Sequence, residues 1–152
     1  DYNQATTYLL QSTKSSNTDW AHQSYIYLAQ IMNMNKNYEQ GRTYARKAYE
    51  LDKTNGEPFI IIGQLYAASA KDCGTDEFYS KTAFWAAVDQ FEKAKSVDPS
   101  LTSKANELIN VYVHYFPTIE NIFFNGFEEG QEFTIDNCWI KEKTKVRAAK
   151  TE

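Results

Sequence analysis

The 152-residue sequence has few of the residues that mark metal centres and nucleic-acid-binding surfaces. It contains two cysteines and two histidines, and its 20 acidic residues outnumber its 16 lysines and arginines, which gives a net charge of −4. This acidic balance argues against nucleic-acid binding, because such proteins usually carry a basic stripe. Cys73 and Cys138 are far apart in the sequence, and only His22 and His114 could join them as ligands. We therefore expect no zinc site, no other metal and no cofactor.

Long apolar runs and catalytic motifs are missing as well. No stretch reaches the roughly 18 apolar residues that a membrane-spanning helix needs, and we interpret the run 59–62 as part of a buried helix. No glycine-rich phosphate loop, zinc-protease motif or EF-hand loop occurs. Neither histidine has a serine, cysteine or carboxylate at the spacing of a known nucleophile motif. The sequence therefore predicts a non-enzymatic protein without catalytic residues and without a membrane span.

Aromatic residues are abundant where leucine is scarce. The chain has 11 tyrosines, nine phenylalanines and three tryptophans, 15% of its residues, whereas leucine occurs only seven times. Large rings are therefore expected to fill much of the interior that leucine usually fills. Rings left on the surface could instead stack on sugars, so a carbohydrate-binding role stays open as an alternative.

Two segments, 37–52 and 84–99, share one spacing pattern. In each, an aromatic residue is followed at three- and four-residue intervals by small or aromatic residues, and an aliphatic-Asp pair lies near the end. These intervals place the side chains on one face of a helix, where small residues let a neighbouring helix approach closely. The upstream segments 19–34 and 57–70 carry a matching pattern, with Trp20 on the inner face of the first. The pattern therefore predicts pairs of helices.

These helix pairs resemble tetratricopeptide repeats, which are helix-turn-helix units of about 34 residues. The signature positions of the family fall in a first repeat on Tyr25, Leu28, Ala29, Met32, Tyr38, Gly41, Ala45 and Ala48. In a second repeat they fall on Phe59, Ile62, Gly63, Tyr66, Phe84, Ala87, Phe91, Ala94 and Pro99. The resemblance implies a mostly α-helical fold in which antiparallel helix pairs form a right-handed α-α superhelix.

The resemblance also divides the chain. Residues 1–117 are assigned to the repeats, as a half repeat 1–18, a repeat 19–55, a long repeat 56–99 and a capping helix 100–117. The long repeat contains an insertion at 71–82, which either extends the helices or forms a loop on one rim. The first ten residues match only the second helix of a repeat. We therefore expect the natural protein to continue N-terminally with further repeats.

Beyond Pro117 the helical period ends, and residues 118–152 are predicted to form a short helix and a β-ribbon cap. Thr118 is the expected N-cap of this helix and Gly126 its end. Segments 131–135, 138–141 and 145–149 show two-residue alternation or β-rich composition, which predicts two or three short strands. Because a ribbon of this size is not stable alone, we expect it to pack on the last helix. The side chains expected to make this contact are Phe124, Phe127, Phe133, Ile135, Trp139 and Ile140.

The same C-terminal region resembles the closing segment of tetratricopeptide proteins from Bacteroidota-type bacteria. The resemblance rests on the residues 114–118, 123–126, 130–135, 139–140 and 144–147. Similar proteins are typically exported, so it implies a periplasmic or exported bacterial protein, with Glu152 at or near the natural C-terminus. The residues alone leave open whether Cys73 and Cys138 form a disulfide, and an oxidising compartment would favour the bond.

In this family the concave groove is lined by first-helix residues that the packing does not use. These positions carry Gln23, Ile26, Gln30 and Asn33 in one repeat and Glu57, Ile60, Gln64 and Ala67 in the next. None is Lys or Arg, so the groove lacks the paired cations that grip a C-terminal carboxylate. We expect a scaffold that binds a peptide or protein segment by shape and by amide hydrogen bonds. The alternatives are a carbohydrate-binding module, a homo-oligomerisation module, or a face that merely packs against preceding repeats or a neighbouring copy.

Overall fold

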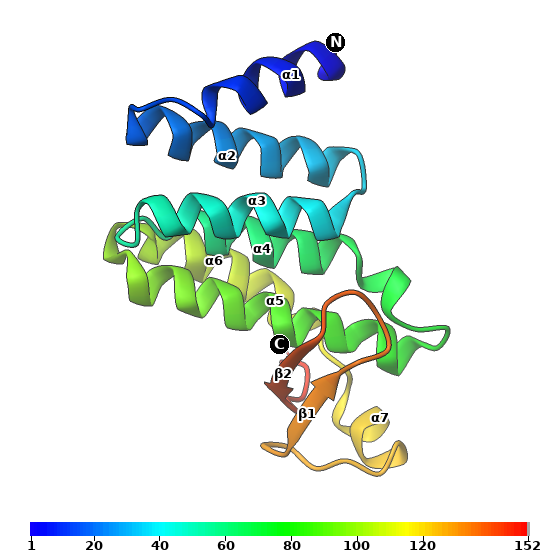
Figure 1. The fold of residues 1–152 in the computed structure, drawn as a ribbon. Helices are drawn as coiled ribbons and strands as arrows, with labels where there is room; N and C mark the ends of the chain where they lie inside the picture. Colours follow the sequence, from blue (N-terminus) through cyan, green and yellow to red (C-terminus); the bar gives the residue numbers. More distant parts are fainter. Residues whose placement is uncertain (152) are drawn as a thin grey trace.

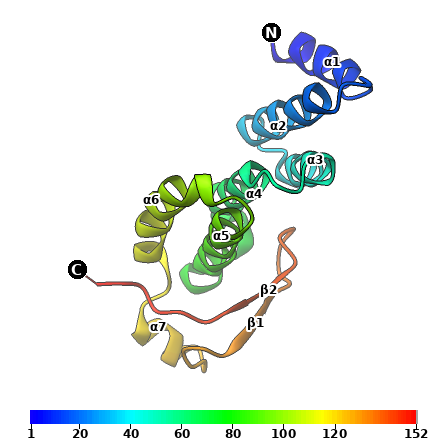
Figure 2. The ribbon, with the colours of Figure 1, turned by 90° about the vertical axis from the view of Figure 1, so that its left-hand side faces the viewer.

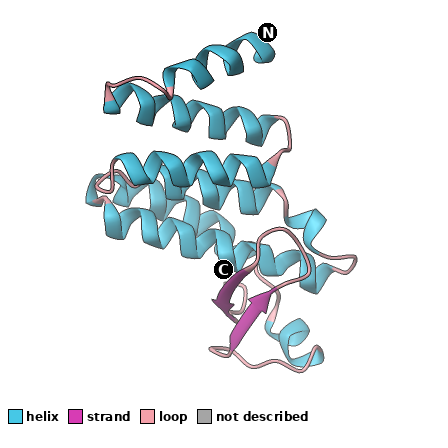
Figure 3. Ribbon diagram, in the orientation of Figure 1, coloured by secondary structure: helices cyan, strands magenta, loops and turns pink. Residues whose placement is uncertain are grey.

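The computed structural model describes residues 1–151, which form a mostly helical protein with one small antiparallel sheet (Figure 1, Figure 3). Its α-helices are α1 (Tyr2–Ser12), α2 (Thr18–Met34), α3 (Tyr38–Leu51), α4 (Glu57–Ala68), α5 (Glu77–Val97), α6 (Thr102–Tyr112) and α7 (Ile119–Phe124). Short 3-10 helices are η1 (Ala70–Cys73), η2 (Pro99–Leu101) and η3 (Val113–Tyr115), and the strands are β1 (Glu132–Ile135) and β2 (Glu142–Lys145). The predicted class, mostly α with a small C-terminal β element, is confirmed.

Side-chain caps fix where several helices begin. Asn17 accepts a hydrogen bond from the N–H of Trp20 at the start of α2, and Asp76 accepts one from Tyr79 at the start of α5. Thr118 caps α7 as predicted. Each cap satisfies a backbone donor that the first turn of a helix otherwise leaves unpaired. These polar residues therefore set the boundaries that the apolar pattern alone leaves loose.

Neighbouring helices run in opposite directions (Figure 1), and each packs on the next in chain order from α1 to α6 (Figure 2). The view turned by 90° shows an arc of helices, with the C-terminal segment crossing beneath α5 (Figure 2). Small residues permit close contacts within the arc. A Cβ placed on Gly63 of α4 would lie 2.8 Å from Cδ1 of Phe91 in α5. Trp85, Tyr66 and Phe91 are fully buried, which confirms that large rings fill the interior.

The two strands only partly match the sequence prediction. β1 lies within the predicted segment 131–135 and pairs antiparallel with β2, so that Glu132 faces Lys145 and Ile135 faces Glu142. The strands predicted at 138–141 and 145–149 are wrong. Lys141 has a positive φ of 50°, which no strand residue adopts, and β2 occupies 142–145 instead. The polar stretch 142–144, expected to separate two strands, is itself most of a strand.

The packing of this ribbon also differs from the expectation, because it lies mainly against α5 and α3 rather than on the last helix. The indole N–H of Trp85 in α5 donates to the carbonyl oxygen of Arg147 at 2.8 Å, and Phe78 of α5 stacks on Phe127 with ring centroids 5.6 Å apart. Only the tail returns towards the end of α6, where the N–H of Lys150 donates to the carbonyl of Val113. Phe124 makes no such contact, since 89% of it is exposed.

The insertion 71–82 forms both a short loop and a helix extension. η1 and a loop occupy its first part, and α5 begins at Glu77, so the helix contains 21 residues. A disulfide joins Cys73 at the end of η1 to Cys138 in the loop between the strands. The side-chain amide of Asn137 also donates to the carbonyl oxygen of Cys73. The insertion therefore anchors the turn of the β-ribbon to the helical stack.

Candidate binding surface on helix α2

The structure closes half of the groove expected from the sequence. Ile26 of α2 and Ile60 of α4 are 3% and 0% exposed, so neither can contact a partner, and their assignment to the groove is wrong. On α4, Gln64 is half-buried and Glu57 pairs with Lys104 of α6 at 3.3 Å. Because α2 and α4 pack directly on each other, the groove positions of α4 lie largely between neighbouring helices. Of the remaining groove positions predicted on α2, Asn33 is half-buried, and Gln23 and Gln30 are exposed.

The exposed glutamines belong to a longer stripe on α2, which we call the α2 stripe. Its members are exposed residues spaced alternately by three and four positions: Trp20, Gln23, Tyr27, Gln30 and Met34. This spacing keeps the side chains on one face of the helix. Of the three apolar members, Trp20 is 68%, Tyr27 48% and Met34 61% exposed. Trp20 therefore lies on the outer face of α2 and not on the inner face predicted for it.

The opposite face of α2 holds the stripe in place. Leu28 and Ala29 are fully buried among the other helices, and the Nδ1–H of His22 donates to the carbonyl oxygen of Ala48 at the end of α3 (2.8 Å). A rigid helix loses little conformational freedom on binding, which favours affinity. The α2 stripe is therefore a preformed surface.

The α2 stripe carries no charge of its own. Its side chains are aromatic rings, a thioether and two amides, and the nearest acid along the helix is Asp19 in the first turn. Beside it lies α1, which has no buried residue and leaves Tyr8 70% exposed. Large aromatic side chains held exposed on a surface are typical of interaction sites. The surface suits a partner that offers apolar side chains and amide-compatible polar groups.

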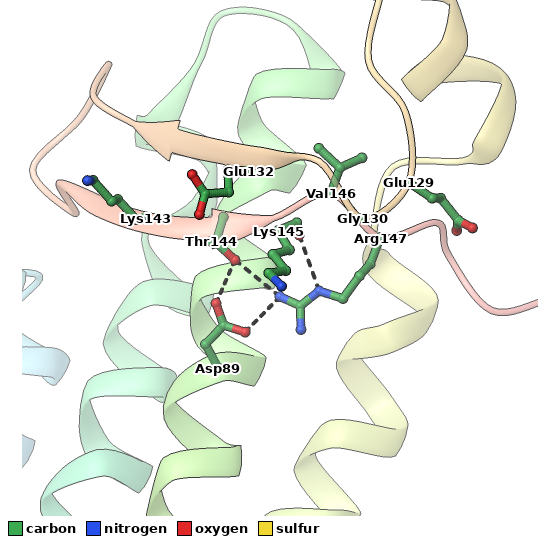
Figure 4. Close-up of a pocket in the computed structure, with 9 residues that line it drawn as sticks. All are labelled: Asp89, Glu129, Gly130, Glu132, Lys143, Thr144, Lys145, Val146 and Arg147. Atoms are coloured by element: carbon green, nitrogen blue, oxygen red, sulfur yellow. Dashed lines mark hydrogen bonds and ion pairs between the residues drawn. The ribbon is translucent and has the colours of Figure 1, made fainter.

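A hollow of about 540 Å³ lies beside β2, and residues of an internal polar link line it (Figure 4). Asp89 of α5 uses both carboxylate oxygens: one pairs with the guanidinium of Arg147 at 2.8 Å and the other accepts from the hydroxyl of Thr144 at 2.5 Å. Arg147 also donates to the carbonyl of Trp85. The other charged side chains of the hollow balance in sign: Lys143, Lys145, Glu129 and Glu132. Its groups therefore fasten the ribbon to α5.

A similar link fastens the strand-to-strand loop to α3 and α4. Arg42 donates to the carbonyl oxygens of Ile140 (2.5 Å) and Trp139 (3.1 Å) and to the hydroxyl of Tyr66 (3.0 Å). The Tyr66 hydroxyl donates in turn to Glu142 at 2.9 Å. Burial raises the pKa of Tyr66 to about 12, with Arg42 opposing the rise and Glu142 adding to it. Tyr66 is therefore a neutral hydrogen-bond donor at physiological pH.

Both histidines hydrogen-bond to backbone carbonyl oxygens through Nδ1. The Nε2 of His22 is buried without a hydrogen-bond partner, and the Nδ1–H of His114 donates to the carbonyl of Lys150 at 2.8 Å. Within residues 1–151 no three His, Cys, Asp or Glu side chains are grouped as a metal site would require. No helix in that range has both the length and the apolar character to cross a bilayer.

No protein-family model, curated protein or solved structure matches this chain. The assignment of the α2 stripe as a candidate binding surface therefore rests on the geometry of the stripe alone. Sequence reasoning found its two glutamines but missed the apolar members. The signal was present, because Trp20, Tyr27 and Met34 recur every seven residues, which is two helical turns. Trp20 was predicted on the inner face, and Tyr27 and Met34 were not predicted as surface residues, because exposure depends on which helices lie beside α2.

Proposed function

We propose that the protein is a non-enzymatic interaction module of the tetratricopeptide type, which binds a helical protein segment on the α2 stripe. The observation that carries the proposal is the stripe itself: Trp20, Tyr27 and Met34 are held in solvent on one face of a helix whose other face is buried. Trp and Tyr are the residues most often responsible for binding energy at protein interfaces. A neutral stripe with two glutamines excludes a strongly charged partner.

The shape of the stripe favours a helix as the bound segment. Alternating intervals of three and four residues are the spacing at which two helices pack side chains between one another, as in coiled coils and helix-in-groove complexes. Gln23 and Gln30 alternate with the apolar residues and can hydrogen-bond to polar groups of the partner. The partner is therefore expected to carry its own apolar stripe with few charges.

The proposal includes a right-handed superhelical arrangement of the helices and a periplasmic or exported location. Antiparallel neighbours, an arc of helices (Figure 2) and buried small residues such as Gly41, Ala45 and Ala48 support a right-handed tetratricopeptide-like stack. The disulfide between Cys73 and Cys138 supports a periplasmic or exported location, because such bonds persist in oxidising compartments.

Carbohydrate binding is the second candidate function, because the exposed rings of Trp20 and Tyr27 could stack on sugars. One experiment separates the two candidates. Tyr27 is replaced by the photo-reactive amino acid benzoylphenylalanine, the protein is irradiated in its native cells, and the crosslinked product is identified by mass spectrometry. The proposal expects a peptide from another protein with an apolar stripe. A crosslink to a glycan, to a second copy, or to another part of the same polypeptide contradicts it.

Affinity measurements then test the residues. With the crosslinked peptide as ligand, Trp20→Ser and Tyr27→Ser should each weaken binding by about tenfold or more, as loss of a central aromatic contact does. Phe124→Ser is the control, because it removes a still more exposed ring at a distant site on α7. Equal affinity of all three variants would refute the assignment of the α2 stripe.

A further inference from the structure

The short helix α7 presents two phenylalanines to solvent on a fixed support. Phe123 is 82% and Phe124 89% exposed, more than any other large apolar residue among the described ones. Between them and the core lies Ile122, which is fully buried and holds the helix. The Thr118 cap and a hydrogen bond from the N–H of Phe127 to the carbonyl of Ile122 fix both ends of α7. The rings are therefore held in place and not carried on a loose tail.

Phe123 forms one wall of an open hollow of about 440 Å³, which we call the α7 pocket. Ile119, which is 49% exposed, Ile122 and Phe127 form the other apolar walls. The ring of Phe127 is itself stacked on Phe78 of α5, with an angle of 9° between the rings. The α7 pocket is thus a preformed apolar recess, large enough to take a single large side chain.

The rim of this pocket is acidic. Glu120, Glu128 and Glu129 line it, and no Lys or Arg does. None of these three glutamates takes part in an ion pair within residues 1–151. Glu129 accepts one hydrogen bond, from the N–H of Ala148. An apolar recess bordered by unpaired carboxylates attracts cationic groups and repels anionic ones.

We propose that the α7 pocket is a docking site for a cationic amphipathic peptide segment, which inserts one aliphatic or aromatic side chain and places flanking Lys or Arg on the glutamates. The faces of Phe123 and Phe124 add cation–π contacts to these flanking cations. An anionic membrane surface, the other usual target of exposed phenylalanines, is disfavoured by the same carboxylates. This docking site is independent of the α2 stripe, since it lies on a different element and recognises charge.

The test uses the whole chain and short synthetic peptides. The first peptide alternates lysine with leucine, the second alternates glutamate with leucine, and the third alternates lysine with glycine. Vesicles of phosphatidylglycerol provide the membrane arm. The proposal expects binding of the lysine-leucine peptide only, measured by calorimetry, and an affinity that falls as salt is added.

Variants locate the contact. Phe123→Ser should weaken binding of the lysine-leucine peptide by about tenfold. Val111→Ser, at an exposed apolar residue of α6 that belongs to neither proposed surface, should leave it unchanged. The double variant Glu120→Gln/Glu128→Gln should weaken it roughly 2- to 10-fold. Its control, Glu39→Gln/Glu107→Gln, changes the net charge equally at exposed acids of α3 and α6. Circular dichroism checks that each variant is folded.

Four outcomes would overturn the proposal. These are no binding of the lysine-leucine peptide, equal binding of the glutamate-leucine peptide, preferential binding of the vesicles, and equal weakening by the two double variants. The last outcome would mean that general charge attraction, and not the α7 pocket, holds the peptide. None of these results bears on the α2 stripe, so the two proposals can fail separately.

Discussion

Removing the disulfide between Cys73 and Cys138 should strongly destabilise the protein. The bond closes a loop with a sequence separation of 65 residues. The loop-entropy relation gives about 4 kcal/mol at 25 °C for such a loop, which is a large part of the 5–15 kcal/mol by which domains are usually stable. Arg42 still binds the carbonyls of Trp139 and Ile140 without the disulfide. We therefore expect the reduced protein to keep its fold and to lose roughly 10 °C in Tm.

Urea unfolding with and without a reducing agent measures this effect. The oxidised wild type should show the higher midpoint, and reduction should lower it to near that of the Cys73→Ala/Cys138→Ala variant. The variant is the control, because the reducing agent has nothing to act on in it and should leave its midpoint unchanged. Titration of free thiols in denaturant gives a direct count. Two free thiols in the untreated protein, or a wild-type midpoint that reduction does not move, would refute the reasoning.

Three further predictions concern the links between helices and ribbon and the packing of two helices on each other. The pKa of Tyr66 rises on folding to about 12, so between pH 10 and 12 the unfolded chain loses a proton that the folded protein keeps. The free energy of unfolding should therefore fall by roughly 2–3 kcal/mol across this range. Chemical denaturation of Tyr66→Phe should show a fall that is smaller by this amount. Arg42→Met should cost about 2–4 kcal/mol, since two carbonyls lose a charged donor, whereas Arg46→Met, at an exposed ion pair, should cost less than about 1. Gly63→Ala should cost about 1–3 kcal/mol because its methyl group overlaps the ring of Phe91; an unchanged Tm would contradict this contact.

The helices could be predicted because their pattern is local. Small and aromatic residues at three- and four-residue intervals placed α2, α3 and α4 within a few residues of their observed bounds. The short helix α7 was likewise found from Thr118 and Gly126, since a cap and a left-handed glycine at φ 81° act within one turn.

The ribbon could be placed less well, because its second strand depends on distant residues. Nothing in the polar sequence 142–144 indicates a strand. Thr144 can be buried there because the carboxylate of Asp89 in α5 accepts a hydrogen bond from its hydroxyl. Residues 138–141, which have the better β composition, are held as a loop by Cys73 and Arg42. Both outcomes rest on contacts between residues more than 50 positions apart, which no local pattern contains.

For the same reason, only part of the candidate binding surface could be predicted from the sequence. The three- and four-residue spacing identified Gln23 and Gln30, which are exposed, together with Ile26, which is buried. Whether an apolar helix residue faces solvent depends on the presence of a neighbouring helix. Tyr27 and Met34 therefore become visible as surface residues only once the neighbours of α2 are placed.

The bonds between Arg42 and the ribbon also have a consequence for synthesis on the ribosome. In a simple helical stack each unit contacts its neighbours and can fold as it emerges. Here Arg42 meets a carbonyl 98 residues later in the chain, at Ile140. While the chain is being made, Tyr66, Trp85 and Phe78 therefore lack the segment that later covers them. We expect a late, slow closing step and, before it, a nascent chain that chaperones can bind.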